Sequence, residues 1–292
     1  MTRQFLATKG TAVSPSPLIN IERTFKGMPA ILMEEGKEVG HITDVVVHPI
    51  EGFVMGFVLI TNDGKEQVLV ANPDQLIFVF ATQNPATNLR KLDRFLVVAE
   101  VNALTAVICV NKIDLVGLDA ARRQFKLYED IGYQVIYTSA VTGEGVAELR
   151  DCLHDKLSVL TGSSGVGKSS LLNAIEPGLG LKVRDVSQTT GKGLHTTRYA
   201  ELFPLAGGGY LADTPGIRGL ALYDLEPWEL DAYFREIAPL VEACQFSDCS
   251  HRHEPNCAVR TAVEDGRISL ERYDSYLRLR EEHEMLDKSA YE

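Results

Sequence analysis

Residues 157–175 of the chain read LSVLTGSSGVGKSSLLNAI. At their centre, residues 162–169 fit the phosphate-binding pattern G-x-x-x-x-G-K-S without a mismatch. The apolar run before this loop predicts a strand, and the run after it predicts a helix. That context favours a phosphate-binding loop over an incidental glycine-rich turn, and it predicts a domain of the α/β class.

We expect this loop to bind the phosphates of a nucleotide. Glycines let backbone N–H groups turn towards the anion, and the N-terminus of the following helix adds positive potential. Lys168 is expected to bridge the outer phosphates, and the Ser169 hydroxyl to bind Mg²⁺. The candidate phosphate-binding residues are Gly162, Ser163, Ser164, Gly165, Val166, Gly167, Lys168, Ser169 and Ser170.

A second motif, Asn111-Lys112-Ile113-Asp114, follows the apolar run TAVICV. A carboxylate at a strand end can accept two hydrogen bonds from the N1 and N2 edge of guanine, and adenine offers no such pair of donors. Four residues alone would also suit a strand-end turn. Thr138-Ser139-Ala140, after the next apolar run, can present N–H groups to guanine O6. The two motifs together predict a guanine nucleotide, with Asn111, Lys112, Asp114, Ser139 and Ala140 at the base.

A third motif, Asp213-Thr214-Pro215-Gly216, is expected to place the Asp213 carboxylate on the Mg²⁺ side and Gly216 at the γ-phosphate. These are the parts of a GTPase that uses GTP, GDP and Mg²⁺. Their order is unusual, because the guanine motifs precede the phosphate-binding loop. A circular permutation explains the order, since it joins the old termini and opens a surface loop without changing which strands are neighbours.

The length of 292 residues predicts about two domains and a small third. We expect a flexible lead-in at residues 1–16, a small β-barrel at 17–72, a circularly permuted P-loop GTPase domain at 73–225 and a helical zinc-binding domain at 226–292. Within the GTPase domain, the apolar runs predict strands at 74–80, 105–110, 133–139 and 157–162, separated by helices near 88–103, 118–131 and 145–156. In the last domain we expect an apolar helix face that packs against the protein, made by Ile268, Leu270, Tyr273, Leu277 and Leu279.

Three of the five cysteines fall between residues 244 and 257, which in a reducing compartment predicts metal ligands rather than disulfides. Cys244, Cys249, His251 and Cys257 offer three thiolates and one imidazole, a closed tetrahedral shell for a structural Zn²⁺. His253 is the alternative imidazole, and free thiols in a helical region are the alternative to a metal site.

The overall charge limits the kinds of partner. Forty acidic against 29 basic residues give a formal net charge of −11, so any contact with nucleic acid requires a local basic patch. Such a run is formed by Lys182, Arg184, Lys192 and Arg198. No apolar stretch is long enough for a bilayer, and MTRQFLATKG lacks the apolar run of a secretory signal. We therefore expect a cytoplasmic protein without a membrane partner.

Over about residues 73–284 the sequence resembles the circularly permuted family of ribosome small subunit-dependent GTPase A (RsgA, also called YjeQ or YloQ). The segments that carry the resemblance are Asp74-Gln75, LDRFLVVAE, NKIDL, TSA, GSSGVGKSSLLNAI, GLHTTR, LADTPGIR, the spacing C-x4-C-x-H-x5-C, and GRISLERYDSYL. The family spacing selects His251 over His253. The resemblance implies a GTPase that docks on the small ribosomal subunit during late maturation and is stimulated by it.

The N-terminal region departs from that family pattern. Such proteins usually begin with an OB-fold barrel that touches ribosomal RNA, followed by an Arg-rich segment. Residues 19–70 resemble a PRC-barrel instead, a small β-domain that also occurs in a ribosome maturation factor that binds a ribosomal protein. The resemblance therefore leaves two partners for this domain, ribosomal RNA and ribosomal protein, and we expect the chain to be a monomer.

The hydrolytic step requires a group that orients the attacking water. Ile217 occupies the position at which small GTPases place a water-orienting glutamine. His195 is the candidate to orient water instead, and Thr196 or Thr197 is expected to contact Mg²⁺ and the γ-phosphate. Two hypotheses follow: a Mg²⁺-dependent GTPase, favoured by His195, and a GTP-gated scaffold with negligible turnover, favoured by Ile217. An ATP-using kinase or transporter ATPase is disfavoured by Asp114.

Overall fold

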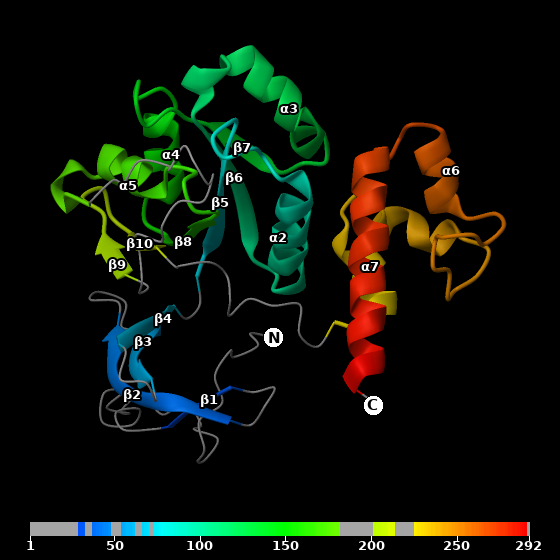
Figure 1. Cartoon of the computed structure of the whole chain (residues 1–292), viewed down its shortest axis with the longest axis horizontal. Coiled ribbons are helices and arrows are strands. Elements are labelled where there is room, and N and C mark those ends of the chain that lie inside the picture. The colour runs from blue at the N-terminus through cyan, green and yellow to red at the C-terminus, as the bar shows by residue number, and fades with distance from the viewer. Residues whose placement is uncertain are drawn as a thin grey trace.

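The computed structural model describes residues 29–32, 37–47, 54–61, 66–70, 73–181, 201–213 and 225–290. They form two β-sheets and a helical C-terminal region (Figure 1). The expected lead-in at 1–16 and the basic run at 182–198 lie outside these ranges. Within the described ranges, no helix combines the length and the apolar character that crossing a membrane requires.

The first sheet contains four antiparallel strands in the order β1-β2-β3-β4. Their bounds are Pro29–Leu32, Lys37–Val47, Val54–Thr61 and Glu66–Val70. Each strand pairs with the next along the chain. Among the described strands β1 and β4 are not paired with each other. Closure of the sheet into a barrel of the PRC type therefore stays a prediction.

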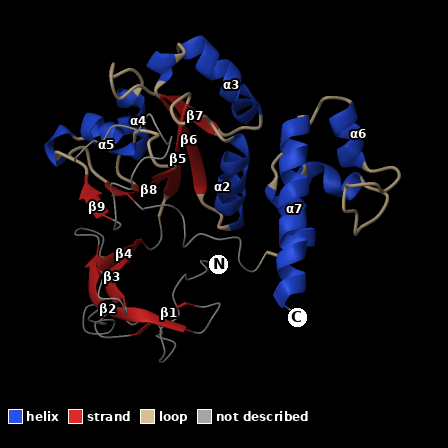
Figure 2. Ribbon diagram, viewed as in Figure 1, coloured by secondary structure: helices blue, strands red, loops and turns tan. Residues whose placement is uncertain are grey.

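The second sheet has six strands in the order β7-β6-β5-β8-β10-β9, and only β9 runs antiparallel to its neighbour (Figure 2). The strands are β5 Gln75–Ala81, β6 Thr105–Asn111, β7 Gln134–Tyr137, β8 Leu157–Gly162, β9 Glu201–Pro204 and β10 Tyr210–Asp213. The strands predicted from the apolar runs are all present. β6 carries the guanine motif and β8 leads into the phosphate-binding loop, with only β5 between them. The fold thus keeps the sites adjacent although their order in the chain is reversed.

Four helices cover the two faces of this sheet: α2 Leu89–Val101, α3 Leu118–Asp130, α4 Val146–Leu153 and α5 Lys168–Ile175. On one face, Phe78 and Phe80 of β5 pack with residues of α2 and α3. On the other face, Ile77 and Val79 pack with residues of α4 and α5. Because both faces are covered, β5 is buried along its whole length. That burial explains the unbroken apolar run from Leu76 to Ala81.

The C-terminal region consists of two short 3₁₀ helices, Pro227–Tyr233 and Ala238–Ala243, and the helices α6 Ala258–Glu264 and α7 Leu270–Ala290. α7 lies alongside α2 (Figure 1). Val97 and Val98 of α2 share an apolar cluster with Leu230, Phe234 and Tyr276 of this region. The C-terminal region therefore packs directly on a helix of the GTPase-like sheet.

A buried polar cluster adds to this attachment. Asp93 of α2 accepts hydrogen bonds from Arg272 Nη1 at 2.8 Å and from the hydroxyls of Tyr128 and Ser275. The Arg272 guanidinium also donates to both carboxylate oxygens of Glu236, from Nε at 2.6 Å and from Nη2 at 3.1 Å. Arg272 is 1% exposed, and its charge is matched by two carboxylates, which is the condition for burying a charge.

The apolar face predicted for the last helix is wrong in part. Ile268 and Leu279 are buried, and Tyr273 and Leu277 are partly buried, but Leu270 is 68% exposed. The side of α7 that faces the protein is largely polar instead, with Arg272, Ser275, Arg280 and His283 among its buried residues. Asp93 accounts for two of these residues, because a buried carboxylate on α2 requires donors from the helix that covers it, and Arg272 and Ser275 supply them.

Candidate active site and metal centre

The phosphate-binding loop joins β8 to α5. Its first and last glycines are required by close contacts with neighbouring strands. A Cβ on Gly162 would lie 2.3 Å from the carbonyl oxygen of Val79 in β5. Gly167 has φ +98°, and a Cβ there would lie 2.3 Å from Nδ2 of Asn111. The loop is therefore packed against the ends of both β5 and β6, so any larger residue would move it.

Lys168 begins α5 and turns back into the loop. Its Nζ donates to the carbonyl oxygens of Gly162 at 2.9 Å and Ser163 at 3.1 Å. Ser169 and Ser170 follow in the first turn of the same helix. The ammonium group is thus held at the loop to which a phosphate would bind, at a helix N-terminus, which suits an anion.

Asn111 connects the guanine motif to the phosphate-binding loop. It is the last residue of β6 and is 1% exposed. Its Nδ2 donates to the carbonyl oxygen of Val166 at 2.9 Å, and its Oδ1 accepts from the backbone N–H of Ala140 at 3.3 Å. A single buried amide therefore holds three loops together: the guanine motif, the Ser139-Ala140 loop and the phosphate-binding loop.

Asp114 lies in the 3₁₀ turn Ile113–Leu115 that follows β6. Its Oδ1 accepts a hydrogen bond of 2.6 Å from the Ser139 hydroxyl. The Ser139 oxygen in turn accepts from the backbone N–H groups of Val141 and Thr142. The carboxylate expected to read guanine is thus oriented by the loop expected to contact O6.

Lys112 extends from the guanine motif over the phosphate-binding loop. Its backbone is left-handed, with φ +65°. Its Nζ donates to the carbonyl oxygen of Gly165 at 2.7 Å and to that of Asn84. Burial lowers the pKa of Lys112, and the Asp114 carboxylate partly offsets that effect. The side chain spans the distance from base site to phosphate site, as a residue lying along a bound nucleotide must.

Of the third motif, the structure describes the backbone of Asp213. β10 pairs in parallel with β8, and Asp213 lies opposite Leu160, two residues before the phosphate-binding loop. The backbone of Asp213 is therefore beside the phosphate site, as the Mg²⁺ role requires. His195, Thr196, Thr197, Gly216 and Ile217 lie outside the described residues.

The cysteine cluster lies between the 3₁₀ helix Ala238–Ala243 and α6. The sulfur atoms of Cys244, Cys249 and Cys257 and one nitrogen of His251 all lie within 4.8 Å of one another. The sulfur atoms of Cys244 and Cys257 are 3.9 Å apart. A tetrahedral zinc with Zn–S bonds of about 2.3 Å separates its sulfur ligands by about 3.8 Å, so the donor set and its spacing fit zinc. His253, the alternative imidazole, is exposed and is not in the cluster.

The Glu254 side chain holds the loop around His251 in shape. Glu254 accepts hydrogen bonds from the backbone N–H groups of Ser250, Arg252 and His253 and from the Ser250 hydroxyl. Desolvation raises the pKa of Glu254, but these hydrogen bonds outweigh it and hold the pKa below its usual range. Burial raises the pKa of Cys249 to about 12, so a metal must displace thiol protons when it binds.

The comparisons with known proteins agree with this geometry. The family model for the RsgA GTPase matches residues 57–223. The chain belongs to the RsgA GTPase family. A protein of Gemmatimonas aurantiaca named small ribosomal subunit biogenesis GTPase RsgA is 49% identical over 217 residues, covering 74% of this chain and 71% of that protein. The protein of the same name from Caldanaerobacter subterraneus subsp. tengcongensis is 43% identical over 254 residues, covering 87% of this chain and 85% of that protein.

Two solved RsgA-type structures have a similar fold. The crystal structure of YjeQ from Thermotoga maritima matches with a TM-score of 0.63 at 37% identity, covering 88% of this chain and 94% of that chain. The crystal structure of YloQ, described as a circularly permuted GTPase, matches with a TM-score of 0.61 at 30% identity, covering 90% and 93%. These matches confirm the resemblance and the permuted GTPase fold predicted from the motif order.

As an RsgA GTPase, the chain is a GTP-hydrolysing enzyme of the P-loop class, and the family implies GTP, GDP and Mg²⁺. This result decides against the scaffold and against the ATP-using enzyme. The cluster at 244–257 is compatible with zinc.

Sequence reasoning missed one side chain at the phosphate-binding loop. Lys91, in the first turn of α2, donates from Nζ to the Ser163 hydroxyl at 3.0 Å. Burial lowers its pKa. Its Nζ also lies 5.3 Å from the centre of the Phe95 ring. Because Lys91 belongs to no motif and is 72 residues from Ser163, only the fold brings it to the loop.

Proposed function

We propose that the chain acts on the small ribosomal subunit as a late-stage assembly checkpoint, hydrolysing GTP to GDP and phosphate. The relatives support the small ribosomal subunit as the partner, because they are named small ribosomal subunit biogenesis GTPases. Two of them are 49% and 43% identical to this chain over 74% and 87% of its length. The main structural support for binding of a guanine nucleotide is the position of Asn111. Its side-chain amide hydrogen-bonds both to the phosphate-binding loop and to the Ser139-Ala140 loop.

In this proposal the described residues divide the nucleotide between them. Asp114 reads the N1 and N2 edge of guanine, and the loop at Ser139 and Ala140 meets O6. Lys168 neutralises the outer phosphates, and the backbone N–H groups of residues 162–170 surround them. Ser169 and Asp213 lie on the Mg²⁺ side. When bound, Mg²⁺ withdraws charge from the phosphate oxygens as the transition state forms.

For the hydrolytic step we assign His195 to orient the attacking water and Thr196 or Thr197 to contact Mg²⁺ and the γ-phosphate. The support is chemical, because the isoleucine at 217 cannot hydrogen-bond water. His195→Ala should leave GTP affinity nearly unchanged and remove most of the subunit-stimulated rate, since water is positioned only as the transition state forms. GTP binding and phosphate release measured on the same preparation separate the two effects, and a surviving stimulated rate would exclude His195.

The same proposal gives the cysteine cluster a structural zinc held by Cys244, Cys249, His251 and Cys257. Four protein ligands complete a tetrahedral shell, so no position is left for a substrate or a reactive water. The support is the spacing of the donor atoms and the chemistry of three thiols and one imidazole. The metal would stabilise the region between the 3₁₀ helix Ala238–Ala243 and α6.

We assign the chain to the cytoplasm as a monomer that meets ribosomal RNA through the basic run at 182–198. The N-terminal sheet would contact either ribosomal RNA or a ribosomal protein. We retain the domain division at residues 17–72, 73–225 and 226–292. The separate sheet formed by β1, β2, β3 and β4 supports the first of these boundaries.

Sedimentation through a sucrose cushion tests the ribosomal part. The protein is mixed with purified small or large ribosomal subunits in the presence of a non-hydrolysable GTP analogue or GDP. We expect it to pellet with the small subunit, more with the analogue than with GDP, and not with the large subunit. Lys168→Ala should lose the nucleotide dependence. Equal pelleting with both subunits, or none with either, would contradict the proposal.

A further inference from the structure

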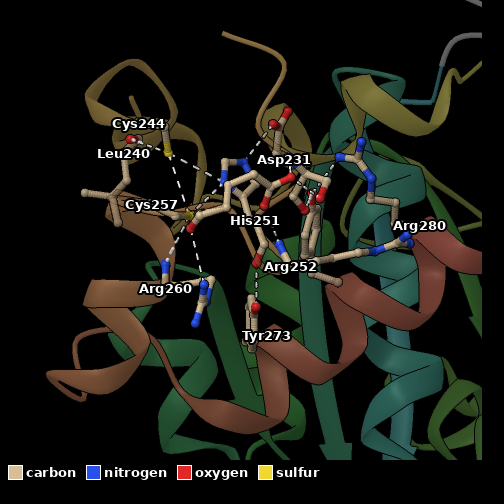
Figure 3. A network of polar contacts seen from close by, with 12 residues as sticks. Asp231, Leu240, Cys244, His251, Arg252, Cys257, Arg260, Tyr273 and Arg280 are labelled. Atoms are coloured by element: carbon tan, nitrogen blue, oxygen red, sulfur yellow. Dashed lines mark hydrogen bonds and ion pairs between the residues drawn. The ribbon is translucent and has the colours of Figure 1, made fainter. Parts of the chain in front are cut away.

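The two ring nitrogens of His251 face different partners. Nδ1 lies 3.3 Å from Cys257 Sγ and 3.6 Å from Cys244 Sγ, so this nitrogen belongs to the cysteine cluster. Nε2 lies 3.1 Å from Oδ2 of Asp231, on the opposite side of the ring (Figure 3). The His251 side chain is fully buried, and that of Asp231 is 11% exposed. The imidazole is thus enclosed between the sulfur atoms and one carboxylate.

The backbone of His251 is held from a separate direction. Its φ of +60° is in the left-handed region, which side-chain-bearing residues rarely adopt. Its carbonyl oxygen accepts a hydrogen bond from the Tyr273 hydroxyl of α7 (Figure 3). This contact fixes the peptide group but not the rotation of the ring. Among the described residues, Asp231 is the hydrogen-bond partner of the ring nitrogen that faces away from the cysteines.

An imidazole nitrogen can bind a metal only through a lone pair. If Nδ1 is the ligand, the ring proton must be on Nε2, where a carboxylate is the best acceptor. We propose that Asp231 is a positioning residue of the metal centre: its carboxylate holds the proton on Nε2 of His251 and so presents Nδ1 to the zinc. This inference rests on the zinc assignment of the proposed function. Asp231 is not itself in the ligand set, because its oxygens are not among the clustered donor atoms.

The position of Asp231 in the chain makes this contact informative. It lies in the 3₁₀ helix Pro227–Tyr233. In the sequence this helix stands between the GTPase domain and the cysteines. That helix also carries Leu230, which is buried with Val97 of α2. The carboxylate therefore connects the metal cluster to the part of the C-terminal region that packs on the nucleotide-binding domain.

Zinc affinity of the full chain tests the proposal, measured at neutral pH by competition with a chromophoric chelator. Asp231→Ala should bind zinc about 10- to 100-fold more weakly than the unaltered protein, the usual cost of removing a carboxylate behind a metal-bound histidine. Asp231→Asn keeps the size of the side chain and one acceptor oxygen. Its zinc affinity should therefore lie between those of the unaltered protein and Asp231→Ala. Asp248→Asn is the matched control, since it removes an exposed carboxylate next to Cys249 and should leave the affinity unchanged.

Thermal unfolding with and without zinc separates this role from a purely structural ion pair. If Asp231 acts through the metal, Asp231→Asn lowers the unfolding temperature of the zinc-loaded protein and hardly changes that of the chelator-treated protein. Equal losses in both forms, with unchanged zinc affinity, would overturn the proposal. Cys249→Ser distinguishes failure of this inference from failure of the zinc assignment. If the unaltered chain binds no zinc, the zinc assignment fails. If Cys249→Ser loses zinc but Asp231→Ala binds it as tightly as the unaltered chain, only the role of Asp231 fails.

Discussion

Arg272→Met should loosen the attachment of α7 to the nucleotide-binding domain. The guanidinium is 1% exposed and donates to Asp93 at 2.8 Å and to Glu236 at 2.6 and 3.1 Å. Burial alone lowers the pKa of Arg272, but the carboxylates of Glu236 and Asp93 outweigh it and raise the pKa above its ordinary value. Methionine fills much of the same volume and leaves both carboxylates without their cation.

Removing one partner of a buried ion pair typically costs about 3–5 kcal/mol. We expect the lower end, about 3 kcal/mol, because Asp93 keeps the hydroxyls of Tyr128 and Ser275 and the Glu236 side chain is 11% exposed to water. Urea unfolding of the zinc-loaded protein measures the loss. The fluorescence of Trp228, the single tryptophan, reports the C-terminal region, and circular dichroism reports the whole chain.

Arg278→Met is the matched control on the same helix. Arg278 pairs with Asp274 at 2.8 Å, but the two side chains are 52% and 42% exposed, so its loss should cost less than about 0.5 kcal/mol. A loss below about 1 kcal/mol for Arg272→Met, or equal losses for the two variants, would refute the view that the buried cluster holds α7 in place.

Asp114→Asn is expected to weaken GTP binding and to favour xanthine nucleotides, because an amide can donate to the carbonyl that xanthine carries where guanine has an amino group. Calorimetry with both nucleotides measures this, and unchanged GTP affinity would remove Asp114 from the site. Gly167→Ala should weaken GTP binding at least about tenfold, or about 1.4 kcal/mol, because its Cβ would meet Nδ2 of Asn111; Gly178→Ala, with nothing within 4 Å, is the control. Burial, and then Arg94, lower the pKa of His283 below 6.5, so the folded protein keeps it neutral while the unfolded chain takes up a proton. Stability should therefore fall as the pH drops below 6.5, and His283→Gln should reduce that fall in the unfolding midpoint.

The nucleotide site was predictable because its chemistry depends on local patterns. β6 and β8 are buried at all but one residue each, and their sequences are accordingly mostly apolar runs that end where the guanine motif and the phosphate-binding loop begin. The glycine positions and the strand–loop–helix context identify the phosphate-binding loop without knowledge of any distant residue. The order of the motifs even predicts the permutation, since parallel strands end at a common edge whatever their order in the chain.

The contacts between the domain and the C-terminal region were not predictable in this way. A helix-face argument assumes that buried residues are apolar, so it favoured Leu270, which is exposed, over Arg272, which is buried. Arg272 is buried only because Asp93 lies 179 residues away in the sequence and beside it in the fold. The contacts of Asp231 and Lys91 were not predicted for the same reason, because their partners are 20 and 72 residues away in the sequence.

GTP turnover with and without purified small ribosomal subunits tests most directly whether the chain is a GTPase that acts on that subunit. Phosphate release is measured under multiple-turnover conditions for the unaltered chain and for Lys168→Ala, with large subunits as the control. We predict a multifold stimulation by the small subunit alone, lost in Lys168→Ala. The same rate with and without small subunits, or no turnover in either condition, would contradict the proposed function.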